Sequence, residues 1–311
     1  MTHDPELISP DLSGRSAIVT GATGGLGLEV ALGLARSGAD VVLTGRDDGK
    51  GRRALDLVRK IDPRGRVAYE ELDLASLASV EAFARRRVAG NAPVDILVNN
   101  AGVMALEPRQ TTSDGFEMQF GTNYLGHFAL TAWLLPALLR SRPEARVVNV
   151  ASLAHRGGRI ALDDLQAEHG YSAWASYRQS KLAMLMFGRE LQRRAAAAGW
   201  PLRSVTAHPG WAYTGIIANG PGRSQAKLMT WLFSQVFRLR GQSAAAGALP
   251  ILYAASAPDA EPGGYYGPSG QGEIRGPVGP SIVMPQAADV AMAERLWARS
   301  EELTGSHFPK P

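Results

Sequence analysis

The sequence predicts an α/β fold, a single-domain doubly wound parallel sheet of about seven strands with helices on both faces. Two observations predict this fold. Short apolar or β-branched runs alternate with helical patterns from residue 16 to residue 207, which is typical of parallel strands covered on both faces. The 311 residues contain no internal repeat and no linker-like stretch, so one domain is the simplest division of the chain. Right-handed crossovers then give the doubly wound order.

Each strand is expected where a short apolar run is bounded by turn residues. Six such runs cover residues 16–20, 40–44, 67–72, 95–99, 146–150 and 203–207. Helical patterns cover residues 26–37, 51–61, 76–88, 116–140, 172–198 and 288–304. Pro136 should break or bend the fourth helix, because proline has no amide hydrogen to donate. Residues 258–285 are dense in Gly and Pro, so we expect loop there, with one short strand near Tyr265 and Tyr266.

Composition excludes several classes of protein and site. The chain has no cysteine, which excludes disulfides and thiolate chemistry and fits a reducing compartment. Its 33 basic and 29 acidic residues give a net charge of +4, too little to indicate a nucleic-acid-binding surface. The six histidines show no metal-ligand spacing, so no metal site is expected.

The amino-terminal residues and the hydropathy pattern bear on location. Residues 1–14 are polar and have neither the basic nor the apolar region of a signal peptide. No apolar stretch reaches the roughly 18 residues that a transmembrane helix needs. We therefore expect a cytoplasmic protein without a transmembrane segment.

A glycine-rich turn follows the first predicted strand and opens the first helix. Glycines in this position let the backbone approach a pyrophosphate, and the helix N-terminus offers it free N–H groups. The sheet is thus predicted to be of the Rossmann type. Residues 45–51 resemble a P-loop but are one residue short and end in Gly, so a nucleoside triphosphatase is rejected. The dinucleotide contacts expected from the turn are Gly21, Thr23, Gly25, Leu26 and Gly27.

The end of the second predicted strand indicates which dinucleotide binds. An acidic residue there accepts a hydrogen bond from the ribose of NAD, whereas an arginine accommodates the 2′-phosphate of NADP. Arg46 holds this position, although Asp47 and Asp48 follow it. The two aspartates also suit the N-cap of the next helix. We therefore favour NADP over NAD.

Four polar residues form a pattern that predicts catalysis. Tyr177 and Lys181 stand four residues apart in a helical pattern, so their side chains share one face. Ser152 follows the fifth predicted strand, at the carboxyl edge where doubly wound sheets bind ligands. Asn123 lies in the helix after the fourth strand. Each residue alone suits a surface or capping role, but their joint order behind the glycine turn indicates an active site.

With these motifs in this order, the chain resembles the short-chain dehydrogenase/reductase family over residues 12–305. The glycine turn is similar to the family's T-G-x-x-x-G-x-G through Gly25 and Gly27, but it also fits the T-G-x-x-G-x-x-G of the extended branch through Gly24. Residues 99–102, Asn-Asn-Ala-Gly, resemble the N-N-A-G of the non-extended branch. Segments 114–117, 123–128, 180–182 and 296–297 resemble the retinol dehydrogenase, protochlorophyllide reductase and WW-domain oxidoreductase group.

The resemblance implies an enzyme that moves a hydride between a nicotinamide cofactor and a carbonyl or alcohol. Tyr177 is implied as the general acid or base, with its pKa lowered by the ammonium of Lys181 and by the positive nicotinamide of NADP⁺. Ser152 would hydrogen-bond the substrate oxygen. Lys181 would also bind the nicotinamide ribose, and Asn123 would hold a water that passes protons to Lys181. Asp73 and Leu74 resemble the pair that contacts adenine in this family, and Pro209 and Gly210 with Thr214 resemble the segment that holds the nicotinamide end. Further cofactor contacts are implied for Asn100, Ala101 and Gly102.

The remaining expectations concern domains, substrate and assembly. We expect an N-terminal extension at 1–14, one catalytic domain at 15–305 and a C-terminal tail at 306–311. Within the domain, residues 214–241 are expected to form a lid over an apolar small-molecule substrate, because residues 226–239 are rich in aromatic and aliphatic side chains. Core packing, a homodimer contact or a membrane contact are the alternatives for that apolar part.

Two other functions stay open at this point. One is a non-catalytic dinucleotide-binding sensor or scaffold of the same fold. The other is a sugar-nucleotide epimerase of the extended branch, against which residues 99–102 argue.

Overall fold

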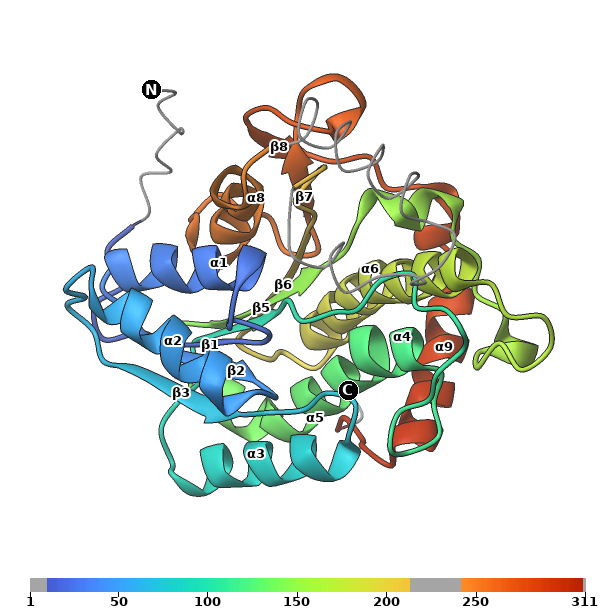
Figure 1. The fold of residues 1–311 in the computed structure, drawn as a ribbon, viewed down its shortest axis with the longest axis horizontal. Coiled ribbons are helices and arrows are strands. Elements are labelled where there is room, and N and C mark those ends of the chain that lie inside the picture. The colour runs from blue at the N-terminus through green and yellow to red at the C-terminus, as the bar shows by residue number, and fades with distance from the viewer. Residues whose placement is uncertain (1–9, 213–241, 310–311) are drawn as a thin grey trace.

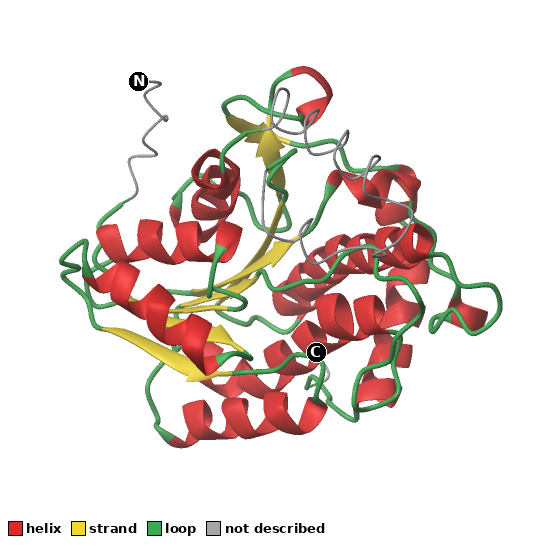
Figure 2. Cartoon of the chain, viewed as in Figure 1, coloured by secondary structure: helices red, strands yellow, loops and turns green. Residues whose placement is uncertain are grey.

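The structure, a computed structural model, describes residues 10–212 and 242–309. Within them, one eight-stranded sheet has the order β3-β2-β1-β4-β5-β6-β7-β8, and helices cover both of its faces (Figures 1 and 2). Strands β1 to β7 pair in parallel, and β8 pairs antiparallel with β7. The predicted doubly wound α/β fold is therefore confirmed, with an antiparallel edge strand added.

Most elements lie within a few residues of their predicted positions. The strands are β1 Ser16–Val19, β2 Asp40–Gly45, β3 Val67–Glu71, β4 Ile96–Asn99, β5 Ala145–Val150, β6 Leu202–Ala207, β7 Tyr265–Pro268 and β8 Val278–Pro280. The α-helices are α1 Gly25–Arg36, α2 Asp48–Arg59, α3 Leu77–Ala89, α4 Met118–Phe120, α5 Gly126–Leu138, α6 Ala173–Ala197, α8 Ala244–Ser256 and α9 Val290–Thr304. Shorter helical turns are η1 Gly121–Leu125, η2 Leu153–Gly157, η3 Leu162–Asp164, η5 Gln271–Glu273 and η6 Pro285–Ala287.

The helices begin where the sequence supplies a polar capping side chain. In α2, α3, α6, α8 and α9, the capping side chain accepts a hydrogen bond from the backbone N–H three residues later, which satisfies one of the free donors of the first turn. Helix α1 differs, because its N-cap is Gly24 and no side chain caps it. The caps are Asp47, Ser76, Ser172, Ser243 and Asp289.

Three features depart from the sequence predictions. Helix α8 was not predicted, because its small residues and internal Pro250 do not form a clear apolar stripe. It is held by α1, where a Cβ on Gly33 would lie only 2.5 Å from Leu252 Cδ1. Strand β8, in the segment predicted to be mostly loop, pairs with β7 despite Pro280. Pro136 does not break its helix, since α5 continues through it to Leu138 and the irregular part is the π-helical η1, while the alternative of a bend at Pro136 stays a prediction.

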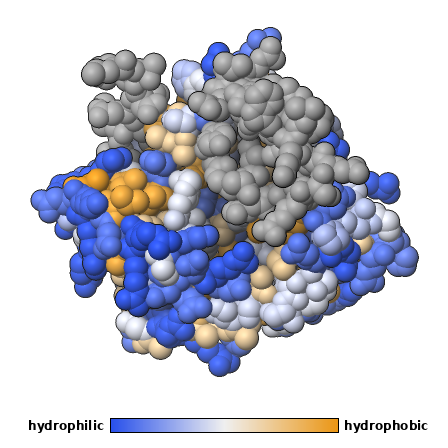
Figure 3. All heavy atoms as spheres, in the orientation of Figure 1, coloured by the Kyte–Doolittle hydropathy of each residue, from blue (hydrophilic) through white to orange (hydrophobic). Residues whose placement is uncertain are grey.

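Two hydrophobic clusters lie on opposite faces of the sheet. One fills the space beneath α3, α5, α6 and α9 and contains Phe83, Phe128 and Phe187. The other lies beneath α1, α2 and α8 and contains Leu34 and Ile251. Hydrophilic residues cover most of the described surface visible in Figure 3. The sheet is therefore buried on both sides, as its continuous apolar strands require.

The chain end joins the first of these clusters. Phe308 is 6% exposed, and its ring centroid lies 4.5 Å from that of Trp297 and 5.3 Å from that of Phe128. The segment after residue 305 is thus packed on the rest of the fold through Phe308. None of the helices in residues 10–212 and 242–309 is both long and apolar enough to span a bilayer.

Candidate active site

The strand order reverses between β1 and β4, and the turns after these two strands border the predicted site. Thr20, directly after β1, begins the first of these turns, and its side chain binds the second turn. Its hydroxyl oxygen accepts from the backbone N–H groups of Asn100 and Ala101 at 2.8 and 2.9 Å. The side-chain amide of Asn100 donates a second bond to Thr20, to its carbonyl oxygen, at 2.8 Å. The two turns are thus joined at the switch point where doubly wound sheets bind ligands.

The glycines of the first turn are required by close backbone approach. Gly21 has a φ of +65°, and a Cβ there would lie 2.8 Å from the Cα of Ala101. A Cβ on Gly27 would lie 2.5 Å from Asn100 Nδ2 and from the carbonyl oxygen of Gly21. Gly25 adopts a φ of 54°, whereas Gly24 is extended and has open space around it. The turn therefore uses the Gly25–Gly27 spacing rather than the Gly24 spacing.

The two aspartates that follow Arg46 both have partners in helix α2. Asp47 caps α2 by accepting from the Lys50 N–H at 2.9 Å, and this bond lowers its pKa. Asp48 forms an ion pair with Arg52 at 2.8 Å. Arg46 is exposed at the end of β2. Both carboxylates thus have partners in helix α2, and the predicted contact of Arg46 with the ribose phosphate stays a prediction.

The next turns contain residues for which cofactor contacts are predicted. Asp73 is partly exposed and accepts from the Ala75 N–H at 3.0 Å, while Leu74 is buried in the core. Gly102 lies near two of the predicted catalytic residues, since a Cβ on it would be 3.1 Å from Asn123 Oδ1 and 3.7 Å from Lys181 Nζ.

Tyr177, Ser152 and Lys181 lie together at the carboxyl edge of β5. Tyr177 is 8% exposed and Lys181 6%, and the Lys181 ammonium lies 6.0 Å from the centroid of the Tyr177 ring. Burial raises the pKa of Tyr177, and the side-chain hydrogen bond with Ser152 lowers it in part. Lys181 donates to the Val150 carbonyl at 3.0 Å, and burial lowers its pKa to about 8. Burial of the phenol therefore dominates the Tyr177 pKa, and its lowering by Lys181 and the positively charged nicotinamide stays a prediction.

Asn123 lies in the π-helical turn η1 and is fully buried. Its Oδ1 accepts from the Val103 N–H at 2.8 Å, and its Nδ2 donates to the Val103 carbonyl and to Ser180 Oγ, each at 2.9 Å. Asn123 therefore fastens the chain after Gly102 to helix α6, which carries Tyr177 and Lys181.

His127 connects Asn123 to the glycine turn, a contact that sequence reasoning missed. Its Nδ1 lies 2.9 Å from the Asn123 carbonyl oxygen, which can only accept, so Nδ1 carries the hydrogen. Its Nε2 then accepts from the Thr20 hydroxyl at 2.8 Å. Burial lowers the pKa of His127 to about 3, so the ring is neutral. The only signal in the sequence is a histidine within an apolar helical run, four residues after Asn123.

Comparison with known proteins identifies the family. The model of the short chain dehydrogenase family matches residues 15–221. Polyprenol dehydrogenase from Mus musculus is 42% identical over 306 residues, which cover 96% of this chain and 86% of that protein. Retinol dehydrogenase 13 from Homo sapiens is 39% identical over 300 residues, covering 96% and 87%. The crystal structure of an uncharacterized protein from Mycobacterium Paratuberculosis matches with a TM-score of 0.79 at 42% identity and covers 97% of both chains.

The chain belongs to the short-chain dehydrogenase/reductase family. The resemblance to retinol dehydrogenases is confirmed by these relatives, and the protein is a dehydrogenase/reductase that acts on alcohol groups with a nicotinamide cofactor.

The residues present fit a nicotinamide dinucleotide. Helix α1 begins with exposed glycines, no capping side chain and no acidic residue in its first turn. Its free N–H groups and positive dipole end suit a pyrophosphate. Thr23 lies against the end of β2, since a Cβ on Gly45 would be 2.5 Å from Thr23 Cγ2, and so holds the turn beside Arg46.

The last predicted contacts lie partly beyond the described residues. Pro209 and Gly210 follow β6 at the same edge, and the Gly210 N–H donates to His208 Nδ1 at 3.1 Å. Thr214 and the predicted lid at 214–241 lie outside the described residues.

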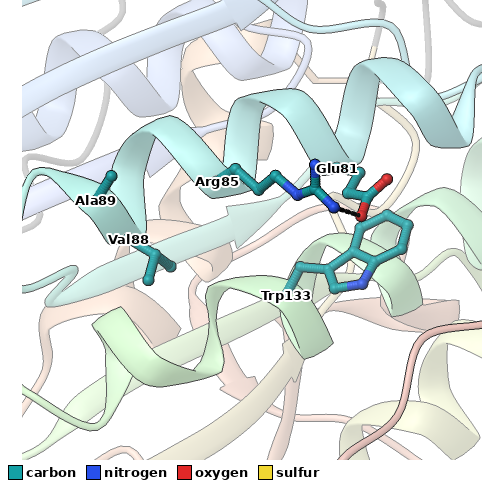
Figure 4. Close-up of a pocket in the computed structure, with 5 residues that line it drawn as sticks. All are labelled: Glu81, Arg85, Val88, Ala89 and Trp133. Atoms are coloured by element: carbon teal, nitrogen blue, oxygen red, sulfur yellow. Dashed lines mark ion pairs between the residues drawn. The ribbon is translucent and has the colours of Figure 1, made fainter.

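A surface pocket between α3 and α5 is a separate feature (Figure 4). None of the predicted site residues borders it, and its Arg85 and Glu81 form an ion pair at 2.7 Å. Its lining residues Val88 and Ala89 belong to the last turn of α3, and a helix between two parallel strands ends at their amino edge. The pocket therefore lies away from the family's reaction site. Its lining residues are Glu81, Arg85, Val88, Ala89 and Trp133.

Proposed function

We propose that the protein is an NADP(H)-dependent oxidoreductase that interconverts a carbonyl and an alcohol on a small apolar molecule, with Tyr177 as the general acid or base. The observation that carries this proposal is the meeting of Tyr177, Ser152 and Lys181 at the edge that the glycine turn also borders. A sensor or scaffold would have no need of this buried set, which is costly to desolvate.

The chemistry follows from the state of each side chain. Burial raises the pKa of Tyr177, so the phenol is protonated at neutral pH and can donate its proton to a substrate oxygen during reduction. Ser152 donates a hydrogen bond to the same oxygen and holds it beside Tyr177. When bound, the nicotinamide supplies or accepts the hydride. In oxidation Tyr177 takes the proton back, and Lys181 would favour its phenolate and bind the cofactor's ribose.

Asn123 has a positioning part in this proposal. Its amide is engaged by Val103 and Ser180, so it keeps helix α6 and the segment after Gly102 in register. Its role as the holder of a proton-relaying water stays a prediction.

The choice of NADP rests on the charges beside β2. Asp47 and Asp48 are committed to helix α2 and to Arg52. Arg46 keeps an exposed guanidinium at the predicted ribose position, where it suits a charge-assisted bond to a 2′-phosphate.

The apolar substrate is supported by an aromatic residue beside Tyr177. Trp174 is 51% exposed, and its ring lies 6.0 Å from that of Tyr177 at an interplanar angle of 80°. An exposed indole beside the Tyr177 ring offers an apolar wall to a substrate. The relatives named for polyprenol and retinol act on long apolar alcohols, in keeping with such a wall.

A substrate panel tests the proposal. Purified protein is mixed with NADPH or NADH and with retinal, a polyprenal, or short polar aldehydes and ketones, and cofactor oxidation is followed by its absorbance. We expect turnover with NADPH and a higher kcat/KM for the apolar carbonyls. Cofactor binding without turnover of any carbonyl would support a sensor and contradict an enzyme.

The proposal also includes the expectations on domain and assembly. Residues 15–305 form the catalytic domain, and the protein is cytoplasmic. It is either a monomer or a homodimer. The lack of cysteine fits a reducing compartment. Cell fractionation and light scattering test the location and the assembly.

A further inference from the structure

Three segments that are far apart in the sequence meet beside Ser152. The first is η2, which follows Ser152 and contains Arg156. The second is the turn at 208–210 after β6. The third is η5, in the connection between β7 and β8. Because β5, β6 and β7 are parallel neighbours (Figure 1), the turns after them lie at one edge of the sheet.

Glu273 in η5 binds both of the other segments. It is 8% exposed. Its Oε1 lies 2.8 Å from Nη2 of Arg156 and accepts from the Ile282 N–H at 3.1 Å. Its Oε2 lies 3.0 Å from Nε2 of His208. The two carboxylate oxygens therefore join the segment after Ser152 to the segment that leads into Gly210.

His208 links the Glu273 carboxylate to the backbone of Gly210. Because the Gly210 N–H donates to Nδ1 at 3.1 Å, Nδ1 is the acceptor and Nε2 carries the hydrogen. Nε2–H can then donate to Glu273, with the Ser281 hydroxyl at the same 3.0 Å. Burial lowers the pKa of His208, in agreement with a neutral ring. A continuous path thus runs from the Glu273 carboxylate through the imidazole to the amide of Gly210.

The backbone around Glu273 indicates that its position is enforced. Its φ of 57° lies in the left-handed region, where a residue with a side chain persists only if its surroundings hold it. The next residue, Ile274, accepts from the Trp211 N–H at 2.9 Å. Gly210 has a φ of +60°, and a Cβ there would lie 2.3 Å from the Ile274 carbonyl oxygen. The segment containing Glu273 therefore holds the turn after β6 at two points.

We propose that Glu273 is a positioning residue that fixes the 208–210 turn relative to Ser152 and so aligns the nicotinamide end of the cofactor with the substrate oxygen. Arg156 holds the carboxylate from the Ser152 side, and His208 transmits its position to Gly210. The inference rests on the proposed function, because it assigns the turn after β6 to the nicotinamide half of the dinucleotide.

The test separates the two halves of the cofactor. Glu273→Gln keeps the side-chain shape and an acceptor for His208, but it removes the charge that Arg156 pairs with. We expect the affinity for NADPH, measured by calorimetry, to fall about tenfold. The reason is that the charge-assisted pair between Glu273 and Arg156, which holds the turn at the nicotinamide half, is lost. The affinity for adenosine 2′,5′-bisphosphate, which lacks the nicotinamide half, should stay unchanged. The kcat should fall by roughly 10–100-fold through misalignment, with a smaller change in KM for the carbonyl.

Two further variants guard against a merely structural effect. Asp95→Asn is the matched control, because Asp95 is also a buried carboxylate, 4% exposed, with an arginine partner, Arg15. Asp95 lies at the amino edge of the sheet, just before β4. The Asp95→Asn variant should therefore lower the melting temperature without changing the ratio of the affinities for NADPH and the bisphosphate. If Glu273→Gln folds poorly, Arg156→Gln tests the same ion pair from its other side. Arg156 is at a half-exposed position, and its variant should show the effect expected of Glu273→Gln.

The outcomes are distinguishable. Equal losses for NADPH and the bisphosphate, or an unchanged ratio together with wild-type kcat, would overturn the role of Glu273. A wild-type protein that binds neither NADPH nor NADH would instead overturn the proposed function, and this inference with it.

Discussion

Asn100 donates to the Thr20 carbonyl while the Thr20 hydroxyl oxygen accepts from the Asn100 backbone, each at 2.8 Å. These two bonds, both donated by Asn100, fix the turn after β4 against the turn after β1. Gly27 lies directly beneath it, since a Cβ there would be 2.5 Å from Asn100 Nδ2. The shape of the cofactor site is therefore set by a side chain that the glycine motif does not contain.

Gly27→Ala should destabilise the protein and weaken cofactor binding, because the added methyl displaces Asn100 or the Gly21 carbonyl. Overpacking of this kind costs about 1–3 kcal/mol, which urea unfolding can measure. Gly24→Ala is the matched control, since nothing lies within 4 Å of a Cβ at that position and its backbone is extended. Similar losses of unfolding free energy in the two variants would contradict the close approach at Gly27.

Tyr177→Phe should abolish turnover and leave NADPH affinity nearly unchanged. Only the hydroxyl is removed, and the ring can still pack at a position that is 8% exposed. Loss of a general acid costs roughly 10²–10⁴-fold in rate. Steady-state kinetics and calorimetry measure the two quantities. Tyr171→Phe is the control, because Tyr171 has no lysine four residues later and its hydroxyl binds the Leu106 carbonyl instead. Near-wild-type turnover in Tyr177→Phe would remove Tyr177 from the mechanism.

Much of the fold could be predicted from local patterns. The strands β1 to β6 have apolar runs, and the caps Ser76, Ser172 and Asp289 precede their helices in sequence. Helix α8 could not be predicted, because its position depends on Gly33 admitting Leu252 against α1. That contact joins residues far apart in the chain and leaves no local pattern.

The candidate site also has residues that could be predicted from the sequence and residues that could not. Tyr177, Lys181 and Ser152 carry a spacing that a single sequence displays, and the structure brings them together. The contacts of His127 with Thr20 and of Glu273 with His208 and Arg156 are tertiary, since these partners lie far away in the sequence. A buried histidine or glutamate has the same appearance in a sequence as an exposed one, so these residues became visible only with the fold.

Arg46→Ala should weaken NADPH binding much more than NADH binding. A guanidinium bound to the 2′-phosphate contributes a charge-assisted bond, worth about 1.5–3 kcal/mol, that the NADH ribose cannot use. Titration of each cofactor gives the two dissociation constants. Arg52→Ala is a suitable control, because Arg52 is an exposed arginine of the same region that pairs with Asp48. Equal effects of Arg46→Ala on both cofactors would mean that Arg46 does not distinguish them.

Trp174→Ala should raise KM for long apolar carbonyls and leave short ones nearly unaffected. The indole is 51% exposed yet lies edge-to-face with the Tyr177 ring at 6.0 Å, so a substrate oxygen that reaches Tyr177 brings its apolar body past Trp174. Burial of an aromatic surface against such a substrate contributes about 1.5–3 kcal/mol, which corresponds to roughly a tenfold or greater change in kcat/KM. The variant Leu57→Ala is the matched control, because Leu57 is 47% exposed on helix α2, remote from Tyr177 in the fold. The measurement is kcat/KM for retinal and for a short aliphatic aldehyde in both variants. If Trp174→Ala lowers the two values equally, the indole supports Tyr177 itself and does not select the substrate; if it lowers neither, the apolar substrate enters by another side of the site.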